Sequence, residues 1–291
     1  MRILSGRAGE ADEGRPLKYY LRSDMGLSSH QLSLAKYEGS IRVNGAVVRV
    51  NECLRAGDLV EVTLTEDAQR SVQPEAGEIH IVYRDEDVLV LDKPAPLACQ
   101  CSPKQPTGTL ENRLAAAFPG EGFLFRPINR LDKGTSGLMA AGMNAWATRR
   151  MQRQLHTPAF IRQYLAVVEG ALTGEGIIDL PIAKCAEATV RRCVDPVHGK
   201  AARTHYRAIE TCAERTLVRL QLDTGRTHQI RVHMSAIGHP LVGDFLYGRE
   251  IGSLPGRFAL HACFLAFDHP ATGERIALTS ELPKELKELL S

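Results

Sequence analysis

The sequence predicts an α+β fold: a small α/β domain, followed by a larger domain on a mixed, largely antiparallel sheet flanked by helices. Two observations support this prediction. Helical and strand patterns alternate irregularly, without the even spacing of a doubly wound parallel sheet. A run at 68–77 lacks apolar periodicity and contains Pro74 and Gly77, as linkers do. We therefore expect domains at 14–67 and 78–291, joined by a linker at 68–77.

The composition is that of an ordinary folded protein. Of 291 residues, 44% are hydrophobic and 24% are charged, and the formal net charge is only +2. The seven cysteines are irregularly spaced, without the recurring pairs of a tetrahedral metal site. No secretory leader and no apolar run of about 18 residues is recognisable. We expect a cytoplasmic protein that does not enter a membrane and binds no metal.

Two short amphipathic helices are predicted near the start of the smaller domain. Apolar residues recur from Leu17 to Leu34, and the pairs Ser23-Asp24 and Ser28-Ser29 are residue types that cap helices. Basic side chains on such helices either contact phosphates or form a solvated helix face. The basic residues in question are Lys18, Arg22 and Lys36.

Strands are predicted to follow these helices. Asn44-Gly45 lies between apolar residues and predicts a hairpin over 41–48, and Gly57-Asp58 precedes an alternating strand. This order of elements resembles the small RNA-binding domain of S4 type, with Val43-Asn44-Gly45 and Ala56-Gly57-Asp58 as landmarks. A protein–protein docking module of similar shape is the alternative. In the RNA-binding case the phosphate contacts are Lys18, Arg22 and Lys36.

The larger domain mixes strands and helices. A charged turn over Arg84–Asp87 separates two apolar strands, and Pro94 stops the second because proline cannot donate to a sheet. Further segments show strand alternation or helical spacing. The predicted strands cover 79–83, 88–91, 163–170, 203–210, 216–223 and 258–267, and the predicted helices cover 109–118 and 144–156.

Asp132 is an isolated acid in a basic segment. Between Arg126 and Tyr164 there are seven Lys and Arg side chains and only this one acid. A basic surface attracts a polyanion, and a lone carboxylate weakens that attraction, which suggests a chemical role. The glycines around it allow sharp turns, and Thr135 and Ser136 can satisfy exposed amides, so that a rigid loop could hold Asp132. The alternative is a structural turn or cap residue.

Two more segments combine polar and aromatic residues. Tyr164 stands early in a predicted strand. Further on, a strand ends at Gly225, Thr227 is the predicted cap, and a helix then carries Gln229, Arg231 and His233. Taken alone, each segment also has a structural explanation, as an edge-strand aromatic or a capped basic helix.

Together these segments resemble the RluA family of pseudouridine synthases, over about residues 82–290. The motifs occur in the same order along the chain, which makes the resemblance specific. They are Leu91-Asp92-Lys93-Pro94, Arg130-Leu131-Asp132 with Thr135-Ser136-Gly137, Tyr164 in Tyr-x-Ala-x-Val, Thr224–His233, Gly238–Asp244, Tyr247-Gly248 and Leu260-His261-Ala262. One departure is Asn129, where the family usually has His, because Asn cannot carry charge.

The resemblance implies isomerisation of uridine in RNA. In this reaction the glycosidic bond breaks, the uracil turns, and its carbon five joins the same sugar, with no electron acceptor. Asp132 is the implied nucleophile or base, and both roles stay open. Arg231 is its implied partner, which keeps a buried carboxylate ionised. The Tyr164 ring is implied to pack against the uracil, and its hydroxyl to help the proton leave carbon five.

Other basic residues are implied to bind RNA. Arg130 fits the family position that fills the gap left by the extruded base. Arg226 is expected at a phosphate or behind the site, and Lys133 is expected beside the RNA. His228 and His233 are expected to be structural, capping or orienting Arg231.

The expected partner is structured RNA, with large-subunit ribosomal RNA as first choice and transfer RNA as second. The chain lacks a phosphate-cradling glycine loop and a dinucleotide fingerprint, so no small-molecule cofactor is expected. A monomer is expected. Two alternatives are a non-catalytic RNA-binding or ribosome-assembly factor and a metal-dependent nucleic-acid hydrolase, although a single carboxylate among cations is a poor metal site.

Overall fold

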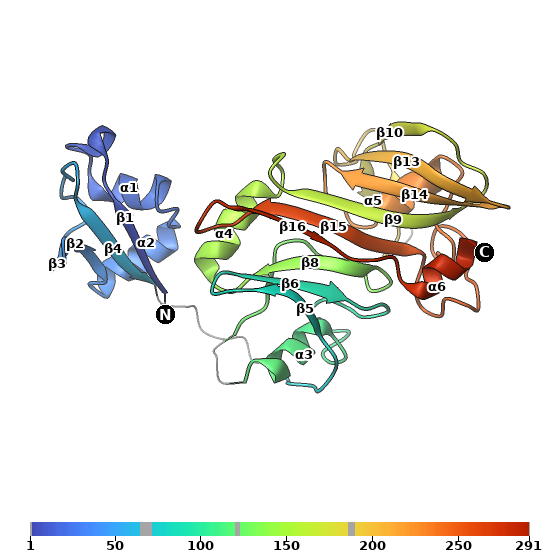
Figure 1. The fold of residues 1–291 in the computed structure, drawn as a ribbon, viewed down its shortest axis with the longest axis horizontal. Coiled ribbons are helices and arrows are strands. Elements are labelled where there is room, and N and C mark those ends of the chain that lie inside the picture. Colours follow the sequence, from blue (N-terminus) through green and yellow to red (C-terminus); the bar gives the residue numbers. More distant parts are fainter. Residues whose placement is uncertain (1, 65–71, 120–122, 186–189, 291) are drawn as a thin grey trace. The chain divides into compact units, whose positions relative to one another are not determined.

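The computed structural model describes residues 2–64, 72–119, 123–185 and 190–290 and divides into two compact units (Figure 1). The smaller unit is Met1–Arg70 with Asn144–Arg150, and the larger unit is Ser71–Met143 with Met151–Ser291. Of the predicted linker, residues 68–71 lie outside the described residues, and residues 72–77 have neither helix nor strand. The domain boundaries proposed from the sequence stay predictions.

The smaller unit contains a four-stranded antiparallel sheet in the order β1-β4-β2-β3, with two α-helices. Asn44 and Gly45 have φ angles of 51° and 81°, and this left-handed pair forms the predicted Asn-Gly turn. Its core includes Leu17, Leu21 and Val60, which are fully buried. The elements are β1 (Arg2–Arg7), a 3₁₀ helix (Glu10–Asp12), α1 (Leu17–Ser23), α2 (Ser29–Tyr37), β2 (Ile41–Val43), β3 (Ala46–Val47) and β4 (Leu59–Leu64).

One of the two predicted caps in this unit is wrong. Ser28 does cap α2, where its hydroxyl accepts from the Gln31 amide and the Gln31 side chain accepts from the Ser28 amide. Ser23, by contrast, ends α1, which begins after Pro16. Proline, with its fixed φ and no amide hydrogen, favours that starting position. The Ser23 hydroxyl donates instead to the Tyr19 carbonyl, one turn back.

Strand β1 was not predicted from the sequence. Its two apolar residues, Ile3 and Leu4, are adjacent, so the segment lacks strand alternation. Leu4 is buried and Ile3 is exposed, and β1 is ordered by its ladder with β4 from Arg7↔Leu59 onward. This strand therefore forms because of its pairing with a strand distant in the chain, which local patterns do not reveal.

The larger unit is built on one ten-stranded sheet, which confirms the predicted fold class. Eight strands follow the order β10-β13-β14-β9-β15-β8-β6-β5, β16 pairs with β15, and β7 pairs with β8. Only the β8–β15 pair is parallel, so the sheet is mixed and largely antiparallel. The strands of this sheet are β5 (His80–Arg84), β6 (Val88–Lys93), β7 (Arg126–Pro127), β8 (Ser136–Gly142), β9 (Ile161–Glu169), β10 (Glu175–Asp179), β13 (Arg203–Cys212), β14 (Arg215–Leu222), β15 (Leu260–Asp268) and β16 (Arg275–Thr279).

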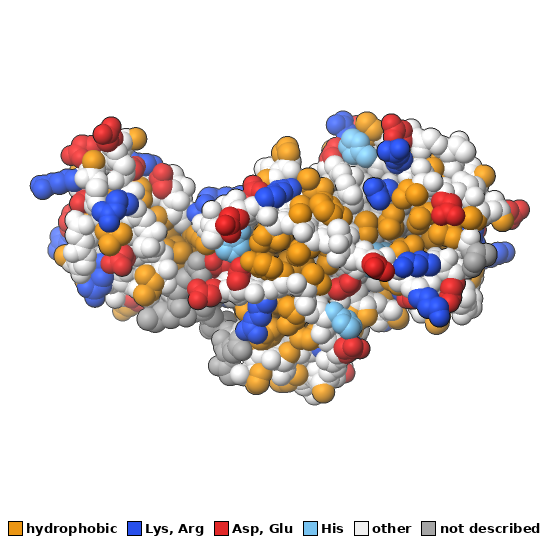
Figure 2. All heavy atoms as spheres, in the orientation of Figure 1, with side chains coloured by type: hydrophobic (Ala, Val, Ile, Leu, Met, Phe, Trp, Pro, Cys, Tyr) orange, Lys and Arg blue, Asp and Glu red, His pale blue; other side chains and the backbone are white. Residues whose placement is uncertain are grey.

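Helices cover both faces of this sheet. One face packs against α3 and α5 through Leu114 and Met234, and the other packs against α4 and α6 through Met151 and Leu286. Between α4 and α6, hydrophobic side chains of the sheet remain visible at the surface (Figure 2). The remaining elements are α3 (Leu110–Ala117), α4 (Ala145–Gln154), β11 (Ile182–Lys184), β12 (Arg192–Val194), α5 (Gln229–Ala236), α6 (Lys284–Lys287) and a 3₁₀ helix (Glu288–Leu290).

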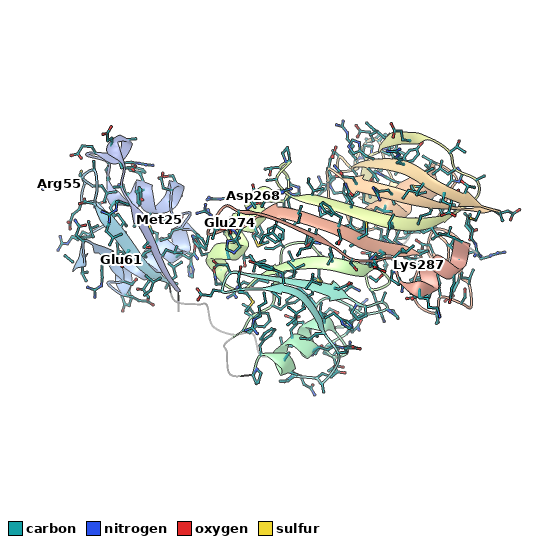
Figure 3. The ribbon with its side chains drawn as sticks, viewed as in Figure 1. Met25, Arg55, Glu61, Asp268, Glu274 and Lys287 are labelled. Carbon is teal, nitrogen blue, oxygen red and sulfur yellow. The ribbon has the colours of Figure 1, made fainter. Side chains whose placement is uncertain are left out.

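The two layers meet around alternating side chains of the sheet. Along β9, Tyr164 and Ala166 face α5, whereas Val167 faces α6. The turn between β15 and β16 carries Asp268 and Glu274, and Lys287 lies near the C-terminus (Figure 3). Among the described residues, no helix combines the length and the apolar character needed to cross a bilayer.

Strand β8 replaces part of the predicted turn at 134–137. Ser136 and Gly137 are the first residues of this strand, which is buried along its whole length. Its small residues have low strand propensity, so no strand was predicted here from the sequence. The backbone is extended because the segment pairs with both β6 and β15 in the centre of the sheet. Asp132 therefore stands four residues before a central strand.

Candidate active site

The loop that carries Asp132 is fixed by backbone hydrogen bonds. The Thr135 amide donates to the Asp132 carbonyl at 3.0 Å, and the Leu97 amide donates to the Lys133 carbonyl at 2.9 Å. Leu131 is buried, whereas the Asp132 side chain keeps 28% of its accessible surface. These bonds hold the backbone of the loop, while the Asp132 carboxylate stays partly accessible.

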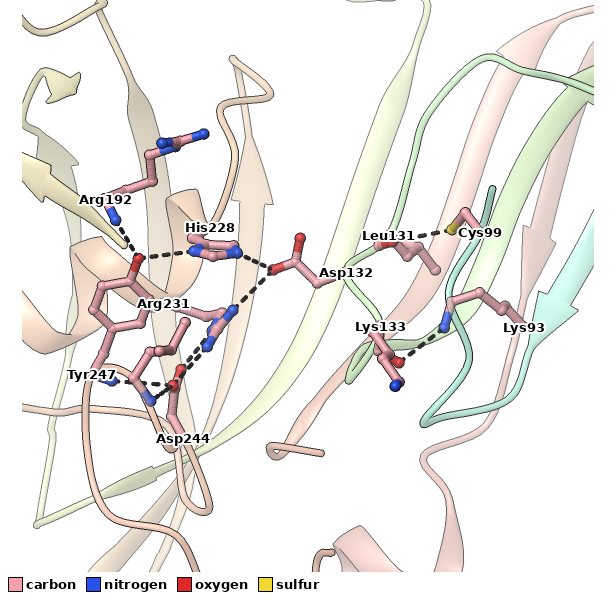
Figure 4. Close-up of polar contacts among 11 residues, drawn as sticks. Lys93, Cys99, Leu131, Asp132, Lys133, Arg192, His228, Arg231, Asp244 and Tyr247 are labelled. Carbon is pink, nitrogen blue, oxygen red and sulfur yellow. Dashed lines mark hydrogen bonds and ion pairs between the residues drawn. The ribbon is translucent and has the colours of Figure 1, made fainter. Parts of the chain in front are cut away.

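Lys93 is a fully buried amine behind this loop. Its Nζ donates to the carbonyls of Leu97 at 2.8 Å and Pro94 at 2.9 Å, and lies 3.5 Å from that of Lys133 (Figure 4). Burial lowers the pKa of Lys93 to about 8. One nitrogen thus ties the loop after β6 to the loop of Asp132.

Arg231 lies between two carboxylates. Its Nε and Nη2 donate to the two oxygens of Asp244 at 2.7 and 2.8 Å, and its Nη1 points to Asp132 Oδ2 at 3.4 Å (Figure 4). The guanidinium keeps 3% of its surface and the Asp244 side chain none. Burial alone lowers the pKa of Arg231, but the bonds to Asp244 outweigh it and the net shift is upward. The cation beside Asp132 is therefore permanent.

Asp244 is a residue of the candidate site that sequence reasoning did not single out. Besides Arg231, its Oδ1 accepts from the amides of Leu246 and Tyr247 at 3.0 and 3.2 Å. The sequence marked Asp244 only as a member of a Gly-Asp motif, and its ion pair spans two elements that local patterns cannot connect. A buried carboxylate with this many donors is a stable anchor for the guanidinium.

His228 extends the same network. Its Nε2 lies 3.9 Å from Asp132 Oδ2, and its Nδ1 is 2.8 Å from the Tyr247 hydroxyl, which also accepts from the Arg192 amide at 2.8 Å. This geometry favours a phenol that donates to Nδ1 and an imidazole with its proton on Nε2, toward Asp132. Burial lowers the pKa of His228 below 6.5, so the ring is neutral at pH 7. His228 thus lies beside the Asp132 carboxylate as well as at the start of α5.

Helix α5 begins differently from the prediction. Its N-cap is His228, with a left-handed φ of 58°, and Thr227 is exposed and does not cap the helix. The Gln229 side chain instead holds the turn before the helix, because its Oε1 accepts from the Arg226 amide at 3.0 Å and the Thr224 hydroxyl at 2.8 Å. A left-handed conformation is uncommon for histidine and is typical of functional sites.

Tyr164 lies inside the sheet face that packs on α5. The residue is 6% exposed and belongs to the main core cluster. Burial raises the pKa of Tyr164; Arg162 opposes that shift, and the nearby charge of Asp132 adds to it. The phenol is therefore protonated at neutral pH and can donate a hydrogen. The structure thus brings Arg231 and Asp132 within 3.4 Å of each other, and the charge of Asp132 acts on Tyr164.

The residues predicted to contact RNA near the site are at least partly exposed. Arg130 and Lys133 are exposed on either side of the buried Leu131 and the half-exposed Asp132. Arg226 donates from Nε to the Ala201 carbonyl at 2.9 Å, so part of its guanidinium holds a neighbouring loop. His233, in contrast, contacts the Thr204 hydroxyl and the Leu180 carbonyl, and not Arg231. His233 thus links α5 to β13 through the Thr204 hydroxyl. Among the described residues, no cluster of three or more His, Cys, Asp or Glu could hold a metal ion.

The fold and this site agree with a match to a known family. Residues 87–236 match the family model of RNA pseudouridylate synthase. The chain is 40% identical over 260 residues to an uncharacterised RNA pseudouridine synthase, YlyB, of Bacillus subtilis, covering 87% of this chain and 85% of the relative. It is 39% identical to the ribosomal large subunit pseudouridine synthase D of Pseudomonas aeruginosa, covering 87% and 84%. The chain belongs to the RNA pseudouridylate synthase family.

A solved structure agrees as well. The human RNA pseudouridylate synthase domain containing 1 superposes with a TM-score of 0.58 at 30% identity, covering 71% of this chain and 86% of that one. The protein is accordingly a pseudouridine synthase, an isomerase that converts uridine in RNA to pseudouridine.

Proposed function

We propose that Asp132 is the catalytic carboxylate, with Arg231 as its charge partner and Tyr164 as the residue that packs against the uracil. The observation that carries this proposal is the 3.4 Å approach of Arg231 Nη1 to Asp132 Oδ2, made by a guanidinium that Asp244 holds in place. A carboxylate that works away from water needs such a cation to remain ionised. Asp132 is also half exposed, so that a ribose can reach it.

The chemistry assigns a task to each group. Breaking the glycosidic bond leaves an electron-poor sugar and an anionic uracil, and an ionised Asp132 either adds to the sugar or takes a proton from it. The freed uracil turns, forms the carbon–carbon bond through carbon five, and must then lose the proton of that carbon. Burial keeps the Tyr164 phenol protonated, so its hydroxyl takes this proton only while giving its own to water, as a relay. Arg231 stabilises negative charge throughout.

Asp132→Asn tests this assignment. The variant keeps the size and hydrogen-bonding capacity of the side chain but removes its charge. We expect loss of tritium release from RNA labelled at carbon five of uridine, with RNA binding retained. An active Asp132→Asn enzyme would place the reaction centre elsewhere.

The substrate is proposed to be large-subunit ribosomal RNA. Support comes from relatives at 39% and 37% identity in Pseudomonas aeruginosa and Xanthomonas campestris whose names specify that RNA. Transfer RNA is the second candidate. Mapping pseudouridine by carbodiimide-blocked primer extension, in cells with and without the protein, distinguishes them, because the site that disappears identifies the RNA.

The smaller unit is proposed to be an S4-type RNA-binding domain at about residues 14–67. Its two helices, its Asn-Gly hairpin and the following strand support this reading. Arg22 and Lys36 are exposed on α1 and α2, and Lys18 is half-buried against the Tyr19 ring. Contacts from such side chains to phosphates position an RNA without reading its sequence.

A further inference from the structure

Phe245 is an aromatic residue at the candidate active site that the proposed reaction does not use. Its relative exposure is 49%, and it is the only phenylalanine of the described residues that is largely exposed. It directly follows Asp244, the anchor of Arg231. Five other phenylalanines are at most 5% exposed, namely Phe118, Phe125, Phe160, Phe258 and Phe267.

The position of this ring is fixed by its neighbours. Asp244 Oδ1 accepts from the Leu246 and Tyr247 amides, so the turn that carries Phe245 is held from the residue before it and the two after it. The Arg231 Cζ lies 5.6 Å from the ring centroid, a cation–π contact, and the same guanidinium approaches Asp132 at 3.4 Å. One side chain therefore separates the Phe245 ring from the reactive carboxylate.

An enzyme that extrudes a base leaves neighbouring bases without stacking partners. Aromatic side chains replace those partners, and stacking tolerates any base because every base has a π-face. Tyr164 cannot serve a flanking nucleotide, since it is buried beneath the site. Phe245 offers a half-exposed ring beside the reaction centre, with Arg130 and Lys133 exposed on the Asp132 loop to meet phosphates.

We propose that Phe245 stacks on an unpaired nucleobase adjacent to the target uridine and so contributes to the choice of RNA site. The inference rests on the proposed reaction centre at Asp132. A purely structural Phe245 would only shield the Arg231 guanidinium from water, and the two roles differ in their kinetics. Stacking acts on RNA binding, whereas loss of shielding acts on the chemical step.

The test compares Phe245→Leu with Phe245→Trp. Leucine keeps an apolar cover over Arg231 but cannot stack, and tryptophan stacks at least as well. Substrates are ribosomal and transfer RNA pools, tritiated at carbon five of uridine and isolated from cells that lack the protein. We expect Phe245→Leu to raise KM about tenfold with kcat within about twofold, and Phe245→Trp to keep KM. The control is Ile209→Ala on β13, matched in exposure at 47%, with no expected change.

Crosslinking identifies the stacked nucleotide. A photoreactive benzoylphenylalanine at position 245 should crosslink to a nucleotide next to the modified uridine. Crosslinks only at distant positions, an unchanged KM in Phe245→Leu, or a kcat that falls equally in both variants would each overturn the proposal. An active Asp132→Asn would instead overturn the reaction centre, so the two failures are distinguishable.

Discussion

Arg231 gives two of its nitrogens to Asp244 and keeps the third for Asp132. The bidentate pair sets the plane of the guanidinium, so Nη1 has one direction in which to point. Three aromatic rings, Phe245, Tyr247 and Phe258, surround the group at 4.1 to 5.6 Å and exclude water from it. The protein itself therefore sets the orientation of the Arg231 guanidinium, without bound RNA.

Loss of Asp244, the carboxylate that anchors Arg231, should reduce both the stability and the activity of the protein. Asp244→Ala leaves the Arg231 charge buried without its main partner, and the expected loss is about 3–5 kcal/mol in the free energy of unfolding. Activity should fall as well, since Nη1 is no longer directed at Asp132. Urea unfolding and tritium release measure the two effects. Asp223→Asn, in an exposed pair with His205, serves as control and should cost below about 1 kcal/mol. A stable, fully active Asp244→Ala would contradict the anchoring role.

Asp132→Asn should separate catalysis from folding. The side chain is half exposed and Arg231 keeps Asp244, so the free energy of unfolding should change by less than about 1 kcal/mol. If the charged oxygen is the reacting group, as nucleophile or as base, the rate at saturating RNA should fall by at least about a thousandfold. Single-turnover tritium release and a filter-binding assay give both numbers. Loss of RNA binding together with activity would instead indicate a binding role.

Tyr164→Phe should keep the ring and lose the hydroxyl. Because the ring is buried, its packing is expected to survive, and RNA binding with it. If the phenol helps the proton leave carbon five, kcat should fall by about 10²- to 10⁴-fold with little change in KM. Tyr164→Leu, which removes the ring as well, is the comparison. An unchanged kcat in Tyr164→Phe would restrict Tyr164 to packing.

Buried histidines should make the protein sensitive to acid. Burial lowers the pKa of His233 and of His261 below the ordinary 6.5. Above pH 6.5 both the folded and the unfolded forms are neutral at these positions, so they contribute no pH dependence. As the pH falls below 6.5 the unfolded chain takes up the proton first, and stability is lost. We expect a falling Tm between pH 6.5 and 5, with a shallower fall in His233→Gln than in wild type. Identical slopes would contradict this.

The basic residues of the smaller unit should govern the salt dependence of RNA binding. Replacing Lys18, Arg22 and Lys36 by alanine should weaken binding and reduce the slope of log K against log salt by about two to three. Fluorescence anisotropy with ribosomal RNA at several salt concentrations measures the slope. Lys284→Ala with Lys287→Ala, exposed on α6, removes charge elsewhere and is the control. Equal slopes in all variants would remove these helices from the RNA contact surface.

Local patterns in the sequence predicted most elements with strong periodicity. The strand of Tyr164 and the Asn44-Gly45 hairpin follow from alternation and turn chemistry, which act between neighbours in the chain. Strand β8 did not, because its small residues become extended only between β6 and β15. The start of α5 was also mispredicted, because His228, with its left-handed φ, takes the N-cap position that Thr227 was expected to occupy.

The candidate site was predictable where single residues were unusual. Asp132 stood out as one acid among cations, and resemblance placed Arg231 and Tyr164. The sequence did not single out Asp244 or Lys93, because local patterns do not show the hydrogen bonds that each makes in the folded protein. A buried ion pair and a buried amine are properties of the assembled core.

Gly137 lies just after the Asp132 loop, at a close contact between two strands of the sheet. Its φ is 107°, and a methyl group on it would lie 2.3 Å from the Ala262 carbonyl oxygen. Gly137 is in register with Ala262, and Ala262 with Tyr164, so the backbone runs from the Asp132 loop to the phenol through two ladders. Main-chain contacts therefore set the spacing between the strand that follows the Asp132 loop and the strand of Tyr164. A side chain at position 137 would force these two strands apart.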